Sequence, residues 1–227
     1  MTAHTAGEGR SDVSGAPHAR MPISVVIADD HDLYRQSLGL VLSLDGDIDV
    51  VGEAANGLEA LDLAVDLQPD IVVLDLQMPR LDGIDAVRSI VDRLQSGQVI
   101  MLTMSELTED LLAALRAGAN GYLLKSAPAE EVLEAIRDVH DGRVVVSPPI
   151  LISLLNEVLL RDQESVDPAI ATERIRDLLR RTARGVSLAE IAEEDDVELE
   201  VVRQEFDDLV RALRDASEPE SSGQRAR

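Results

Sequence analysis

Three aspartates, one threonine and one lysine follow short apolar runs in this sequence, and together they could transfer phosphoryl groups. They are Asp29, Asp30, Asp75, Thr103 and Lys125. Neighbouring carboxylates repel one another unless a cation neutralises them, and Mg²⁺ prefers oxygen ligands and keeps waters that a phosphate oxygen can replace. A lysine ammonium and a threonine hydroxyl can hold phosphoryl oxygens, and an aspartate can accept the phosphoryl group as an acyl phosphate. The set therefore indicates magnesium-dependent phosphoryl transfer.

Each of these residues also has an ordinary structural interpretation. A single aspartate is often a helix N-cap, and a single lysine is often a solvated surface charge. However, 20 of the 21 basic residues are arginine, and Lys125 is the only lysine. A lone lysine beside a set of strand-end oxygens favours the functional interpretation. His31, which follows the aspartate pair, is predicted to be a loop residue and not a phosphorelay histidine.

Alternating strand and helix patterns position this set. Apolar runs of strand length cover Ile23–Ala28, Ile48–Ala54, Ile71–Leu74, Val99–Thr103 and Gly121–Leu124. Helical spacing follows each run, at about Leu33–Leu44, Leu58–Leu67, Ile84–Leu94, Leu107–Ala117 and Glu130–His140. This alternation predicts an α/β doubly wound, five-stranded parallel sheet. The carboxyl ends of its strands meet at one edge, where we expect the set to converge.

The residues around the set resemble the receiver domain of two-component response regulators. The resemblance rests on Asp29-Asp30, Asp75-Leu76-Gln77-Met78-Pro79-Arg80-Leu81-Asp82-Gly83, Leu102-Thr103 and Gly121-Tyr122-Leu123-Leu124-Lys125, and it covers residues 21–142. It implies a flavodoxin-like fold in which a sensor histidine kinase phosphorylates Asp75. The protein would then not be a free-standing enzyme, although it could remove its own phosphoryl group.

The same resemblance assigns roles to the surrounding residues. Asp30 would bind Mg²⁺ directly, Asp29 largely through water, and Gln77 through its backbone carbonyl, beside Asp75. Thr103 and Lys125 would hold the phosphoryl oxygens. Tyr122 would be a switch that turns inward when Thr103 moves.

Composition excludes several other classes of protein. The formal net charge is −23, only three residues are aromatic, and there is no cysteine. Disulfide scaffolds, thiol catalysis and nucleic-acid binding by the whole surface are therefore excluded. The longest apolar run, Ile150–Leu160, contains Asn156 and Glu157 and is shorter than the roughly 20 residues of a membrane span. Residues 1–20 lack the apolar core of a signal peptide, so we expect a cytoplasmic protein without membrane contact.

Composition also divides the chain. We expect a disordered extension over 1–20, the receiver over 21–142, a linker with one helix over 143–167, a helix-turn-helix over 168–215 and a disordered tail over 216–227. The linker helix is predicted at Ile150–Leu160, after the structure-breaking pair Pro148-Pro149. Met21 directly precedes the first strand and is a candidate start residue.

The C-terminal part reads as three helices, at about Glu173–Arg184, Leu188–Glu194 and Leu199–Arg214. Gly185 would end the first, and Ser187 with Glu190 would form a capping box on the second. The pattern resembles the output domain of NarL- or LuxR-type regulators at Gly185-Val186-Ser187, Glu190-Ile191-Ala192, Val197, Val202-Arg203, Leu209 and Leu213. The resemblance implies a homodimer that binds DNA, with Val201, Arg203 and Arg211 as the contacts.

Acidic residues set this segment apart from its family. Asp195, Glu198, Val201 and Glu205 stand where the family usually has an apolar residue, a serine, a threonine and a polar DNA-facing residue. Residues 187–216 hold eleven acidic residues and three arginines, which opposes contact with phosphates. Five arginines on the first helix could partly offset this: Arg174, Arg176, Arg180, Arg181 and Arg184. Two hypotheses stay open, a phosphorylation-gated regulator that binds DNA weakly, and a degenerate acidic module that contacts protein instead.

Overall fold

Runs of buried, mostly β-branched residues form the central sheet of this protein. The computed structural model describes residues 21–94, 97–151, 153–154, 173–184, 186 and 188–215. Its strands are β1 (Ile23–Ala28), β2 (Ile48–Ala54), β3 (Ile71–Leu74), β4 (Gln98–Thr103), β5 (Gly121–Leu124) and β6 (Val145–Val146). All pair in parallel, in the order β2-β1-β3-β4-β5-β6. The predicted doubly wound parallel sheet is confirmed, with one more strand than expected.

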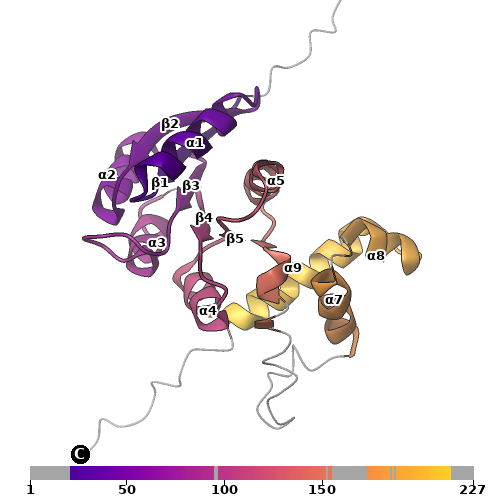
Figure 1. Cartoon of the computed structure of the whole chain (residues 1–227). Helices are drawn as coiled ribbons and strands as arrows, with labels where there is room; N and C mark the ends of the chain where they lie inside the picture. The colour runs from indigo at the N-terminus through magenta and orange to yellow at the C-terminus, as the bar shows by residue number, and fades with distance from the viewer. Residues whose placement is uncertain are drawn as a thin grey trace, which may run out of the picture.

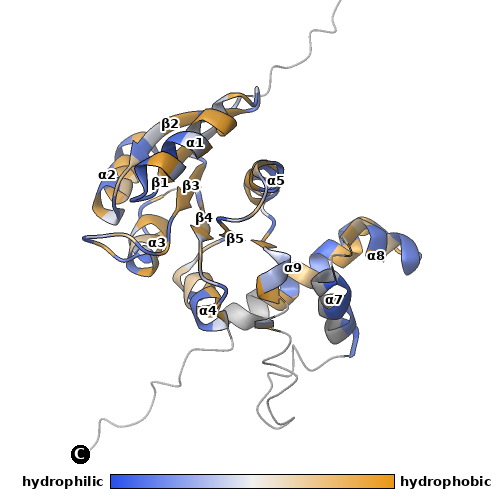
Figure 2. Ribbon diagram, viewed as in Figure 1, coloured by the Kyte–Doolittle hydropathy of each residue, from blue (hydrophilic) through white to orange (hydrophobic). Residues whose placement is uncertain are grey.

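Five helices cover the two faces of the sheet. They are α1 (Asp32–Ser43), α2 (Gly57–Leu67), α3 (Gly83–Val91), α4 (Thr108–Ala117) and α5 (Ala129–His140). Alternate strand residues point to opposite faces, so Val25 packs with α1 and α5 while Val26 packs with α2, α3 and α4. The inner strands β3, β4 and β5 are accordingly almost entirely buried, whereas the edge strand β2 has exposed polar residues and the helices are hydrophobic on one side (Figures 1 and 2). This arrangement brings every βα connection of the carboxyl edge to the same side.

A sixth strand and the start of a helix lie in the first part of the predicted linker. Val145 and Val146 pair with Gly121 and Tyr122 of β5. A helix then begins at Pro148, because proline fits the first helical turn, where its missing N–H has no partner to lose. The prediction that the proline pair breaks the structure is therefore wrong. The predicted helix beyond residue 154, the terminal extensions, Gly185 and Ser187 lie outside the described residues.

Three further helices form the C-terminal unit, α7 (Glu173–Ala183), α8 (Leu188–Glu194) and α9 (Leu199–Asp215). Figure 1 shows α9 running from beside α4 outward to α8. Leu111 and Leu115 of α4 share one hydrophobic cluster with Phe206 and Leu209 of α9. The N–H of Val144 also donates a hydrogen bond to Asp207 Oδ1 at 3.1 Å. The output helices are thus packed against the α4 side of the sheet.

No helix among the described residues is both long enough and apolar enough to cross a membrane.

Candidate functional site

The connections after β1 and β3 hold the aspartates in place through backbone hydrogen bonds. The N–H of Asp75 donates to the carbonyl of Ala28 at 2.9 Å, and the N–H of Asp29 donates to that of Ala54 at 3.1 Å. These bonds extend the sheet ladder by one residue on each strand. The carboxylates of Asp29 and Asp75 therefore stand at adjacent strand ends, and both are buried.

Gly83 allows the β3–α3 connection to fold tightly beneath Asp75. Its N–H donates to the carbonyl of Leu76 at 3.0 Å. A Cβ atom at this position would lie 2.5 Å from the Leu76 carbonyl oxygen and 2.6 Å from that of Asp75. Contacts that short do not occur in folded proteins, so only glycine permits this connection.

Lys125 joins the two buried aspartates. Its Nζ lies 2.6 Å from Asp29 Oδ2 and 2.8 Å from Asp75 Oδ2. The lysine side chain is only 7% exposed, and those of Asp29 and Asp75 are 3% and 4% exposed. Burial raises the pKa of Asp75 despite the opposing effect of Lys125. Burial alone would lower the pKa of Lys125, but its hydrogen bonds to both carboxylates raise it overall.

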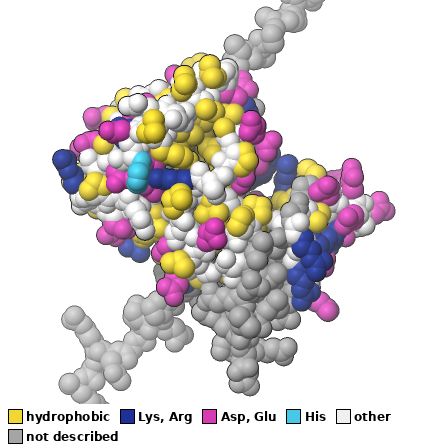
Figure 3. Space-filling view, in the orientation of Figure 1, with side chains coloured by type: hydrophobic (Ala, Val, Ile, Leu, Met, Phe, Trp, Pro, Cys, Tyr) yellow, Lys and Arg dark blue, Asp and Glu magenta, His cyan; other side chains and the backbone are white. Residues whose placement is uncertain are grey.

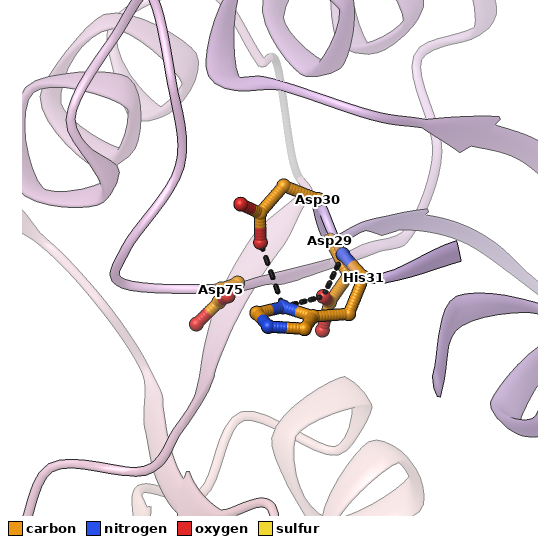
Figure 4. A group of neighbouring side chains, drawn as sticks. All are labelled: Asp29, Asp30, His31 and Asp75. Carbon is orange, nitrogen blue, oxygen red and sulfur yellow. Dashed lines mark hydrogen bonds and ion pairs between the residues drawn. The ribbon is translucent and has the colours of Figure 1, made fainter. Parts of the chain in front are cut away.

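A group of possible metal ligands surrounds this pair. Asp29, Asp30, His31 and Asp75 each offer one ligand atom, and these atoms lie within 4.8 Å of one another (Figure 4). Three carboxylates match the oxygen ligands that Mg²⁺ prefers. Two of them are buried and share a single ammonium as counter-charge, so a further cation would be electrostatically favourable here. The residues present therefore fit a magnesium site.

Two contacts in this neighbourhood were not predicted from the sequence, one made by His31 and one by Tyr34. His31 is the N-cap residue of α1, as a loop residue would be, but its Nδ1 also lies 2.8 Å from Asp30 Oδ1. Tyr34 lies under Lys125, with the ammonium 5.0 Å from the ring centroid, and burial raises the pKa of its phenol to about 12. The position of Tyr34, one helical turn after Asp30, was the only available signal.

Ser105 forms hydrogen bonds with both Thr103 and Tyr122. The hydroxyl of the buried Thr103 accepts a hydrogen bond from the N–H of Ser105 at 3.0 Å. The Tyr122 ring is fully buried, and its hydroxyl donates to the Ser105 carbonyl at 3.4 Å. Burial raises the pKa of Tyr122 to about 12. Gln77 donates its N–H to Asp75 Oδ1 at 3.3 Å, whereas the role of its carbonyl at a metal stays a prediction.

Comparisons with known proteins point to a single family. The family described as response regulator receiver domain matches residues 25–137. The nitrate/nitrite response regulator protein NarL of Escherichia coli (strain K12) is 31% identical over 204 residues, which are 88% of this chain and 94% of that protein. The oxygen regulatory protein NreC of Staphylococcus carnosus (strain TM300) is 35% identical over 204 residues, which are 87% of this chain and 94% of that protein. A LuxR-family two-component response regulator from Aurantimonas sp. SI85-9A1 is structurally similar, with a TM-score of 0.58, 33% identity, and coverage of 61% of this chain and 99% of that one.

The chain belongs to the NarL/LuxR-type response regulators. Its relatives are named as regulatory proteins and not as enzymes.

In this response regulator, two of the three acidic departures of the output domain, Asp195 and Glu205, have partners on α7. Arg174 contacts Asp195 at 2.5 Å and Glu205 at 2.9 Å. Arg181 contacts Asp195 at 2.7 Å and Glu194 at 2.5 Å. Hydrogen bonds to Arg174 and Arg181 hold the pKa of Asp195 below its ordinary value. Asp195 and Glu205 are therefore internal partners of the two arginines, a pairing that their separation in the sequence concealed.

The predicted DNA contacts are only partly brought together. Val201 is 48% exposed near the start of α9, and Arg203 is half-buried on the same helix. Arg211 lies on α9 as well, but its side chain is outside the described part of the structure. Of the five arginines that could meet phosphates, Arg174 and Arg181 of α7 are engaged in ion pairs, whereas Arg180 of α7 and Arg184, directly after that helix, are exposed. The side chain of Arg176 lies outside the described part of the structure.

Proposed function

We propose that this response regulator accepts a phosphoryl group on Asp75 from a sensor histidine kinase and thereby controls its output domain. The contact of one ammonium with two buried carboxylates carries the proposal, because it assembles the acceptor, a phosphoryl-binding cation and a metal-binding carboxylate at one edge. Asp29, Asp30, Asp75 and the Gln77 carbonyl would hold Mg²⁺. When bound, this ion supplies positive charge that neutralises phosphoryl oxygens.

The chain's own residues position the reaction. A carboxylate oxygen of Asp75 forms the new bond to phosphorus while the bond between phosphorus and the donor's leaving atom breaks. Lys125 stays within reach of Asp75 and is free to exchange part of its carboxylate contact for a phosphoryl oxygen. The Thr103 hydroxyl accepts a hydrogen bond from the N–H of Ser105, and a hydroxyl can turn its own proton toward a second phosphoryl oxygen.

The signal would leave the site through Thr103 and Ser105. A Thr103 hydroxyl drawn toward a phosphoryl group pulls on Ser105, whose carbonyl accepts from Tyr122. These residues precede α4, the helix against which α9 packs. Phosphorylation would shift the equilibrium between this docked arrangement and a released one. Release would also free the receiver surface for the homodimer, which remains a prediction.

Phosphorylation can be tested on the full-length protein with a small phosphodonor and Mg²⁺. We expect one base-labile, acid-stable phosphoryl group by intact mass, and none in Asp75→Asn. Asp62→Asn, on the exposed face of α2, is the matched control and should label normally. Labelling that persists in Asp75→Asn would contradict the assignment.

For the output, we propose control of transcription through α7–α9, with weak affinity for DNA. A second candidate, contact with a protein in place of DNA, is favoured by one observation: Arg174 and Arg181 are already bound to acidic residues of the same domain. Anisotropy titration of the phosphorylated full-length protein with labelled duplex DNA separates the two. Affinity that falls steeply with salt supports DNA binding, and absence of binding at low salt leaves the protein-contact candidate.

A further inference from the structure

A groove opens at the turn between α8 and α9, outside the receiver site. Its cavity volume is about 480 Å³, and it is lined by Ala189, Ala192, Glu193, Asp196, Val197 and Leu199. Figure 1 shows that α8 projects away from the receiver, while the other end of α9 lies beside α4. The groove is therefore accessible even while the output domain is docked.

The floor of the groove is apolar and continues onto the surface. Ala192 is buried and Leu199 is partly buried in the core of the domain. Val197 lines the groove and is 39% exposed, and Val201, in the first turn of α9, is 48% exposed. The fold does not use these exposed valine surfaces. They offer an apolar side chain of a partner a place to be buried.

The groove has an acidic rim: Glu193 and Asp196 line it, and Glu198 and Glu200 follow them closely in the sequence. Within the described residues, no ion pair involves Glu193, Asp196, Glu198 or Glu200, and all four are exposed. The neighbouring Glu194 and Asp195 turn the other way, to Arg181 and Arg174 of α7. Figure 3 shows this division as basic side chains over α7 and acidic ones around the outer end of α8.

We propose that this groove binds a cationic segment of a partner protein, with an apolar side chain seated between arginines or lysines. The apolar residue would lie against Ala192, Val197 and Leu199, and the cationic groups would meet the acidic rim. The proposal rests on the protein-contact candidate above and adds the surface and the chemistry of the partner. Phosphate backbones and anionic lipids would be repelled by the same rim, so charge complementarity selects a basic protein segment.

The two parts of the groove should act differently on binding. Rim charges steer encounter, so their removal should slow association and reduce its dependence on salt. An anchor buried in the groove controls dissociation, so Val197→Ser should speed it.

The test uses the full-length protein and two fluorescein-labelled helical peptides of equal charge. One peptide carries a leucine face flanked by arginines, and the other has serine at each leucine position. The groove variant is Glu193→Gln with Asp196→Asn. Its matched control, Asp62→Asn with Asp66→Asn on the exposed face of α2, changes the net charge equally. Circular dichroism of both variants checks their folding.

We expect the leucine peptide to bind the groove variant about tenfold more weakly than the wild type, with less than a twofold change in the control. The serine peptide should bind the wild type about tenfold more weakly than the leucine peptide. Equal weakening in both double variants, or equal binding of both peptides, would overturn the proposal in favour of general attraction to an acidic protein. A labelled DNA duplex is titrated in parallel. Tight binding of the duplex would refute the protein-contact candidate itself, whereas the peptide results test only the groove.

Discussion

Replacement of Lys125 by methionine should destabilise the receiver and, at the same time, strengthen its binding of magnesium. The ammonium lies 2.6 and 2.8 Å from two carboxylates whose side chains are almost fully buried. At an effective dielectric constant of about 20, each contact corresponds to about 6 kcal/mol of Coulomb energy, most of which desolvation of the three groups offsets. Removal of one partner from a buried pair typically costs about 3–5 kcal/mol, because the remaining charge is left uncompensated.

The assay is urea unfolding in EDTA and again in Mg²⁺. With an m-value of about 2 kcal/mol/M, a loss of 3 kcal/mol lowers the urea midpoint by about 1.5 M. Mg²⁺ should then restore more stability to Lys125→Met than it adds to the wild type, because the metal no longer competes with the ammonium for Asp29 and Asp75. The exposed pair Arg88–Asp85 supplies the control, since Arg88→Met should cost less than about 1 kcal/mol.

The loss of stability caused by Lys125→Met should also depend on pH. Burial already raises the pKa of Asp75, and loss of the ammonium raises it further. A carboxyl whose pKa is higher in the folded than in the unfolded protein contributes stability that is lost as pH rises. The difference in urea midpoint between the variant and the wild type should therefore be smaller at pH 4.5 than at pH 7. An unchanged midpoint in EDTA at pH 7, or equal stabilisation of both proteins by Mg²⁺, would refute the reasoning.

Three other predictions concern separate parts of the molecule. Asp75→Asn should remove a carboxyl whose raised pKa makes folding less favourable as pH rises, so the change in urea midpoint from pH 4 to pH 7 should be more favourable in the variant than in the wild type. Gly83→Ala should cost about 1–3 kcal/mol in urea unfolding and slow phosphorylation of Asp75, because its Cβ would strike two carbonyl oxygens; an unchanged midpoint would show that the loop can move aside. Arg181→Gln should lower the thermal midpoint of the output domain and do so less in 1 M salt, since its contacts with Asp195 and Glu194 are ionic.

Most of the sheet could be predicted because its inner strands are buried on both faces. Four of five predicted strands have the bounds seen in the structure, and β4 begins only one residue earlier, at Gln98. Continuous apolar runs mark such strands without reference to tertiary contacts. By contrast, β6 is two residues long and exists only through its pairing with β5, so no local pattern announces it.

The candidate site likewise has a part that the sequence predicts and a part that it does not. The strand ends that carry Asp75 and Lys125 follow from the strand pattern, so their convergence could be expected before any coordinates. The contact of Tyr34 with Lys125 could not, because it depends on the orientation of α1 over the site. Nor could the pairing of Arg174 with Glu205, which requires α7 and α9 to lie side by side. Sequence patterns place backbone elements, whereas contacts between side chains of different elements need the packing itself.

The ion pairs of α7 bear directly on the choice between the two output functions. For Arg174 or Arg181 to bind a DNA phosphate, it must give up its contact with Asp195, whose charge would then lie near the phosphate backbone with one arginine partner fewer. The domain would lose an internal contact and gain a repulsive one in the same step. A cationic protein segment demands no such exchange, because the exposed acidic residues of the groove have no ion-pair partner within the described chain to give up. The same acidic residues that weaken contact with DNA therefore leave contact with a basic partner unopposed.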